Sequence, residues 1–115
     1  TIVSDAARSG EAQMAVYAAA KAGAAGLMRS LAVEGGRHGI TVNSIALGTM
    51  RTPISEAFWA KEDNPRAKGL LQRYAIRRPG LPEDVAALTV FLASDQASWI
   101  TGQTYPLNGG ASFAL

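Results

Sequence analysis

The stretch ITVNSIALG, residues 40–48, decides the fold. It is a nearly continuous apolar run that contains β-branched residues. Such a run is typical of a strand that lies inside a parallel sheet and is buried on both faces. Parallel strands are joined by crossover connections, most simply helices. The sequence therefore predicts an α/β protein in which residues 40–48 form a central parallel strand.

The segments before this strand fit the same arrangement. Residues 14–35 are rich in Ala, Leu and Met and predict a long helix, which the glycines that follow it end. Residues 1–4, TIVS, predict an earlier buried strand, and the polar residues 5–13 predict a loop. Glycine is a poor helix former, so Gly23 and Gly26 predict close packing of this helix against another element.

The segments after the central strand complete the pattern. Residues 54–76 predict an interrupted helical region with a break near Pro65. The run PGLPEDVAALTVFLASD predicts a helix, because Pro82 suits a first turn and the acids Glu83 and Asp84 favour its positive end. The run SWITGQTYPLNGG predicts a turn, a last strand and a glycine-rich tail. Three strands with exposed edges make a poor independent sheet, so the order matches half of a doubly wound fold.

Composition excludes several kinds of site. The 115 residues are 48% hydrophobic and 17% charged, which is typical of one globular domain. The absence of cysteine excludes disulfides, thiolate metal sites and cysteine nucleophiles, and His38 alone cannot form a histidine metal site. Basic residues are scattered, with a net charge of +2, so we expect no nucleic-acid surface. The one basic cluster, Arg73, Arg77 and Arg78, predicts a solvated helix end; the alternative is a contact to a subunit or to an acidic substrate group.

No apolar run approaches the roughly 20 residues of a membrane span, and no charged-then-apolar leader is present. We therefore expect a cytoplasmic protein without a membrane partner.

The most informative side chains are Tyr17 and Lys21, in the stretch VYAAAKAG. On a helix, positions four apart lie one turn apart on one face. A lysine ammonium there stabilises tyrosinate and lowers the tyrosine pKa from its reference near 10. A tyrosine so tuned exchanges a proton with an alcohol or carbonyl oxygen near neutral pH. The pair taken alone also fits a surface pair without function.

Ser4 strengthens the functional interpretation. It ends the first predicted strand, and the end of a strand beside the start of a helix is where an α/β sheet builds its crevice. A hydroxyl there can hold a carbonyl oxygen next to the tyrosine. The stretch NSIALGTMRTP, residues 43–53, ends the central strand at the same edge of the sheet.

Together these residues resemble the short-chain dehydrogenase/reductase family. The resemblance is close to the branch of that family that is similar to three-oxoacyl-carrier-protein reductases. Ser4, Tyr17 and Lys21 match the Ser…Tyr-x-x-x-Lys signature at its usual spacing. The resemblance implies that Tyr17 is the general acid/base and that Ser4 orients the carbonyl or hydroxyl of the substrate. It implies that Lys21 lowers the tyrosine pKa and that Lys21, beside Tyr17, contacts the cofactor at the nicotinamide ribose.

The loop after the central strand departs from the family pattern. The family usually reads Asn-x-x-x-Pro-Gly-x-x-x-Thr, whereas this chain has Leu47 in place of the proline, followed by Gly48 and Thr52. The resemblance implies that Gly48, Met50 and Thr52 contact the cofactor, with Met50 and Thr52 at the nicotinamide carboxamide. The missing proline loosens the constraint on this loop, and ordinary loop residues are the alternative for Met50 and Thr52.

Two further segments match the family without adding chemistry. Asn108 stands where aspartate is common, which implies packing and subunit contacts. Residues 54–74 stand where the family places a substrate lid. There Phe58 and Trp59 either line a pocket or pack in a core.

The resemblance covers essentially the whole chain but only the C-terminal half of the family's fold. We therefore expect residues 1–115 to be the C-terminal catalytic half of one doubly wound, Rossmann-like domain, with the N-terminal nucleotide-binding half absent. The implied activity is hydride transfer between NAD or NADP and a small carbonyl compound or secondary alcohol, in a homo-oligomer, a tetramer or dimer, that needs no metal.

A second hypothesis stays open, because no G-x-G-x-x-G turn occurs in the chain. The run GGRHG follows a predicted helix. A phosphate-binding turn must instead come directly before a helix, so this run does not fit that role. The chain would then be a truncated, non-catalytic relic that acts as an assembly or interaction module, with its strand edge covered by a second chain.

Overall fold

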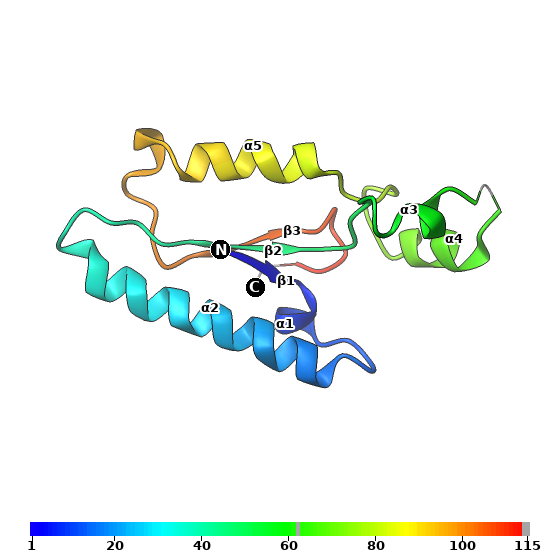
Figure 1. The fold of residues 1–115 in the computed structure, drawn as a ribbon, viewed down its shortest axis with the longest axis horizontal. Helices are drawn as coiled ribbons and strands as arrows, with labels where there is room; N and C mark the ends of the chain where they lie inside the picture. Colours follow the sequence, from blue (N-terminus) through cyan, green and yellow to red (C-terminus); the bar gives the residue numbers. More distant parts are fainter. Residues whose placement is uncertain (62, 114–115) are drawn as a thin grey trace.

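The computed structural model describes residues 1–61 and 63–113, and within these residues helices separate successive strands along the chain (Figure 1). In chain order the elements are β1 (Ile2–Ser4), α1 (Ala6–Ser9), α2 (Ala15–Gly36), β2 (Ser44–Leu47), α3 (Glu56–Trp59), α4 (Pro65–Leu71), α5 (Pro82–Leu92), the short 3-10 helix η1 (Asp95–Ala97) and β3 (Thr104–Leu107).

The strands form a parallel sheet in the order β1-β2-β3, with Leu47 aligned with Ser4 on one side and with Leu107 on the other. Strand β2 is therefore central, and its first three residues are buried. The predicted α/β class and central parallel strand are confirmed.

The central strand is shorter than the predicted 40–48, because side chains replace part of the ladder before it. The Val42 N–H donates to the Thr101 hydroxyl at 3.0 Å, and Asn43 donates to the carbonyl of Ile100 at 2.8 Å. Regular pairing begins only at Ser44, whose N–H donates to the carbonyl of Gln103.

Helices cover both faces of the sheet. Figure 1 shows α2 on one side and α5 on the other, with α3 and α4 beyond the carboxyl end of β2. The side of α2 toward the sheet is a stripe of small residues: Ala25 packs with Val3 and Ala46 in a buried cluster. These crossover helices bring the carboxyl ends of the strands, and the loops that follow them, to one edge of the molecule.

Two predictions about the helices need correction. The predicted loop 5–13 contains the short helix α1, which begins at Ala6. Asp5 is its N-cap residue, and the carbonyl of Asp5 accepts hydrogen bonds from the N–H groups of Arg8 and Ser9. The close packing predicted at Gly23 and Gly26 is not found within the described residues. A Cβ at Gly23 would meet nothing within 4 Å, and one at Gly26 would meet only the side chain of Arg29.

The interrupted helical region is confirmed. Helix α4 begins at Pro65, and the Asn64 side chain caps it by accepting hydrogen bonds from the N–H groups of Arg66 and Ala67. Among the residues that the structure describes, no helix is long and apolar enough to cross a membrane.

Candidate active site

Ser4 and Tyr17 line the same cavity, which has a volume of about 250 Å³. Ser4 reaches it from the end of β1 and Tyr17 from the first turn of α2, while Gly48 closes it from the loop after β2. The structure thus brings together three of the predicted site residues at the carboxyl edge of the sheet. Lys21, Met50 and Thr52 do not line this cavity.

Lys21 lies beside the cavity, against Tyr17. Its Nζ is 5.9 Å from the centroid of the tyrosine ring and donates a long hydrogen bond of 3.4 Å to the carbonyl of Ile2. Tyr17 is 44% exposed, and within residues 1–61 and 63–113 its hydroxyl has no hydrogen-bond partner. The ammonium is therefore near the phenol, and both groups have hydrogen-bonding capacity left for a ligand.

Ser4 is half-buried, and its hydroxyl oxygen accepts a hydrogen bond of 3.3 Å from the Ala6 N–H. With this contact Ser4 also caps the end of strand β1. The hydroxyl proton is not used in it, so Ser4 can still donate a hydrogen bond into the cavity.

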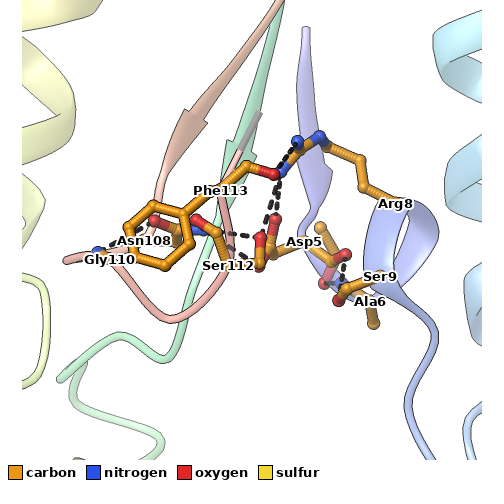
Figure 2. Close-up of polar contacts among 9 residues, drawn as sticks. Asp5, Ala6, Arg8, Ser9, Asn108, Gly110, Ser112 and Phe113 are labelled. Atoms are coloured by element: carbon orange, nitrogen blue, oxygen red, sulfur yellow. Dashed lines mark hydrogen bonds and ion pairs between the residues drawn. The ribbon is translucent and has the colours of Figure 1, made fainter. Parts of the chain in front are cut away.

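A buried polar cluster lies directly behind Ser4, and sequence reasoning missed it. Figure 2 shows the Asp5 side chain between the end of β1 and the loop after β3. Asp5 and Asn108 are each only 7% exposed. The donors to the Asp5 carboxylate are Arg8 Nη1 at 2.6 Å, Ser112 Oγ at 2.7 Å and Asn108 Nδ2 at 3.0 Å. The cluster ties the strand end that carries Ser4 to the end of β3.

Asn108 also explains why position 48 is glycine. A Cβ at Gly48 would lie 2.9 Å from Asn108 Cα and 3.2 Å from Cε1 of Tyr74. At under 3.0 Å from a backbone atom, a Cβ at position 48 would force the loop after β2 or the backbone at Asn108 to shift, which favours glycine here. The Asn108 side chain faces Asp5, where an aspartate would place two carboxylates in contact.

The predicted cofactor-binding groups of Met50 and Thr52 are partly engaged within the chain. The Met50 carbonyl accepts hydrogen bonds from Ser55 Oγ at 3.0 Å and from Trp59 Nε1 at 3.2 Å. The Thr52 N–H donates to Ser55 Oγ at 2.9 Å. Trp59, edge-to-face with Phe58 at 4.8 Å between ring centroids, therefore braces this loop and does not line the Ser4–Tyr17 cavity.

Two arginines of the predicted basic cluster, Arg73 and Arg78, make different contacts in the structure. Arg78 forms a bidentate ion pair with Asp84 at the start of α5, at 2.7 and 2.9 Å. The hydrogen bonds from Arg78, and then that from the Leu81 N–H, lower the pKa of Asp84 to about 2. Arg73 instead lines the Ser4–Tyr17 cavity, together with Glu11. Within the described ranges, no group of three or more His, Asp or Glu side chains could hold a metal ion.

Comparison with known proteins agrees with this geometry. A family model described as enoyl-(acyl carrier protein) reductase matches residues 1–112. The chain belongs to the short-chain dehydrogenase/reductase family. It is 42% identical over 102 residues to the 3-oxoacyl-[acyl-carrier-protein] reductase FabG of Rickettsia felis, an alignment that covers 89% of this chain and 41% of the relative.

Solved short-chain dehydrogenase/reductase structures share the fold. A putative 2-deoxy-D-gluconate 3-dehydrogenase from Agrobacterium tumefaciens with bound NADP superposes with a TM-score of 0.87 at 39% identity, covering 96% of this chain and 44% of that one. A 4-hydroxyisoleucine dehydrogenase complexed with NADH superposes with a TM-score of 0.86 at 30% identity, covering 100% of this chain and 46% of that one. The chain thus spans less than half the length of each of these relatives.

Proposed function

We propose that the protein that contains this sequence is an NAD(H)- or NADP(H)-dependent oxidoreductase. It transfers hydride between the nicotinamide and the carbon of a small carbonyl compound or secondary alcohol. The observation that carries the proposal is that Ser4 and Tyr17, from separate elements, line one cavity with the Lys21 ammonium beside the phenol.

The side chains divide the proton chemistry as follows, in the direction of carbonyl reduction. The Tyr17 hydroxyl donates its proton to the carbonyl oxygen as the carbon accepts hydride. Ser4 donates a hydrogen bond to the same oxygen and holds it against the phenol. The positive charge of Lys21 stabilises the negative charge that develops on the tyrosine oxygen. In alcohol oxidation the same groups act in reverse.

The nicotinamide cofactor supplies or accepts the hydride when it is bound. Lys21 fits a role at its ribose, because the single long hydrogen bond to Ile2 leaves ammonium protons for ribose hydroxyls. Gly48 fits a close approach of the loop backbone. The Met50 carbonyl fits less well, because it already accepts two hydrogen bonds. We therefore assign the nicotinamide end to Lys21 and the loop 48–52, through groups other than this carbonyl.

The relatives support the class of reaction and not one substrate. Their names include a 3-oxoacyl-[acyl-carrier-protein] reductase and a 4-hydroxyisoleucine dehydrogenase, and their structures contain NADP or NADH. Arg73 and Glu11 give the cavity wall both charges, which favours a polar substrate. We propose residues 1–115 as the C-terminal catalytic half of one domain, in a cytoplasmic homo-oligomer.

The test uses the full-length protein. Titration with NADH and NADPH should change the fluorescence of the reduced nicotinamide, and addition of a 3-oxoacyl thioester or a small ketone should consume it. Binding to neither nucleotide would contradict the proposal and favour an assembly or interaction module.

A further inference from the structure

Tyr74 is buried against the loop that we assign to the nicotinamide. It follows helix α4 and is 8% exposed. Its ring lies between two glycines: a Cβ at Gly48 would lie 3.2 Å from Cε1 of Tyr74, and a Cβ at Gly109 would lie 3.2 Å from Cδ1. An apolar ring would satisfy this packing alone, so the hydroxyl needs its own explanation.

The Tyr74 hydroxyl makes two short hydrogen bonds to one residue of the loop. It accepts from the Thr49 N–H at 2.8 Å and donates to Thr49 Oγ1 at 2.8 Å. The segment that follows Tyr74 holds the same stretch of backbone, because the Gly80 N–H donates to the Thr49 carbonyl at 3.0 Å and the Arg51 N–H donates to the Gly80 carbonyl at 2.8 Å. Both backbone groups of Thr49 are therefore fixed from outside the loop.

We infer that Tyr74 is a positioning residue for the nicotinamide-binding loop, residues 48–52, and that its hydroxyl supplies a constraint that the residue at position 47 does not. Leu47 is the last residue of β2, where pairing with Ser4 and Leu107 holds the backbone, but this pairing does not extend to the loop residues that follow Gly48. The two hydrogen bonds to Thr49 restrict the loop two residues after Leu47. This inference rests on the proposed function, because it concerns how the loop meets the cofactor.

This restriction acts on one end of the cofactor only. Without the hydroxyl, the Thr49 N–H loses its hydrogen-bond partner and the free loop samples more conformations. Binding of the nicotinamide must then order the loop, and the lost conformational entropy weakens the affinity. Because we assign only the nicotinamide end of the cofactor to this loop, we expect the adenosine end to keep its affinity. Comparing the affinity for the whole dinucleotide with the affinity for its adenosine end therefore distinguishes an effect on the loop from a general loss of structure.

The experiment compares Tyr74→Phe with the wild type in the full-length protein. Tyr74→Phe keeps the ring between the two glycines and removes only the hydroxyl. The dissociation constant is measured for NADH or NADPH, and for ADP-ribose or its 2′-phosphate, which lack nicotinamide. We expect roughly three- to tenfold weaker binding of the reduced dinucleotide and unchanged binding of the nicotinamide-free probe.

Two further variants keep the test decisive. Tyr105→Phe is the matched control, because within the described part of the chain the Tyr105 hydroxyl has no hydrogen-bond partner; it should bind both probes as the wild type does. Thr49→Val removes the acceptor for the Tyr74 proton while keeping the Thr49 N–H. It should weaken binding of the reduced dinucleotide by a smaller factor than Tyr74→Phe does, and it takes the place of Tyr74→Phe if that variant does not fold.

The outcomes are distinguishable. Unchanged dinucleotide affinity in Tyr74→Phe, or equal weakening of both probes, overturns the positioning role and leaves the proposed function intact. A wild type that binds neither probe overturns the proposed function and this inference together.

Discussion

Replacing Asn108 with aspartate would exchange the amide donor that faces Asp5 for a second carboxylate. Asn108 Nδ2 lies 3.0 Å from Asp5 Oδ2, and both residues are buried. Two unit charges about 3 Å apart repel by about 5 kcal/mol at an effective dielectric constant of about 20. The folded variant avoids this repulsion by binding a proton, which at pH 7 costs about 4 kcal/mol for a carboxyl with a reference pKa of about 3.9. We therefore expect Asn108→Asp to lower the free energy of unfolding by about 4 kcal/mol at pH 7.

The pH dependence gives this prediction its signature. Between about pH 4 and pH 7 the folded variant binds one more proton than its unfolded state, so the loss of stability grows as the pH rises. At pH 5 the cost of the shared proton falls to about 1.5 kcal/mol. Urea unfolding of the full-length protein at pH 5 and pH 7, for wild type and variant, measures both values.

A double variant controls for damage unrelated to charge. Combining Asn108→Asp with Asp5→Asn exchanges donor and acceptor and leaves one carboxylate in the cluster. We expect it to recover more than half of the loss at pH 7. A loss below about 1 kcal/mol for Asn108→Asp at pH 7, or an equal loss at both pH values, would refute the reasoning.

Two further predictions concern stability. Gly48→Ala should lower the unfolding free energy by about 1–3 kcal/mol, because the new Cβ would lie 2.9 Å from Asn108 Cα. Gly23→Ala is the control and should be neutral or stabilising, because its Cβ would meet nothing within 4 Å. Similar urea midpoints for the two variants would contradict the packing described at Gly48. Asp84, whose pKa Arg78 lowers from 3.8 to about 2, should stabilise the fold above pH 4 and lose that contribution as the pH falls toward 2. Asp84→Asn should flatten the unfolding curve against pH in this window, and an unchanged curve would count against the pair.

The parts of the fold that follow from local pattern could be predicted from the sequence. The apolar run at 40–48 predicted a buried parallel strand, and the alanine-rich run at 14–35 predicted a helix that the structure places at Ala15–Gly36. The candidate catalytic pair followed from helix geometry, because Tyr17 and Lys21 lie one turn apart whatever surrounds them. Ser4 could be added because the carboxyl ends of parallel strands meet at one edge.

The contacts that depend on topology could not be predicted in this way. Asp5 and Asn108 are far apart in the chain, and the polar run after Ser4 predicted only a loop. The aspartate directly after the strand was the available signal, since a carboxylate there must find donors if the sheet edge closes over it. The hydroxyl of Tyr74 on Thr49 is likewise invisible to periodicity, because it joins two loops.

The missing proline illustrates the same limit. From the sequence, Leu47 predicted a loosened loop after the central strand. In the structure, Tyr74, Ser55 and Trp59 all donate to or accept from the backbone of that loop. The missing proline therefore predicted a less restricted loop backbone, whereas in the structure hydrogen bonds from residues outside the loop restrict it.

The most direct test of the central claim is the turnover of Tyr17→Phe in the full-length protein, measured by consumption of NADH or NADPH with a carbonyl substrate that the wild type reduces. The account predicts that turnover falls by at least about a hundredfold while the dissociation constant of the reduced dinucleotide stays within a few-fold of wild type. Retained turnover in this variant would contradict Tyr17 as the acid/base group.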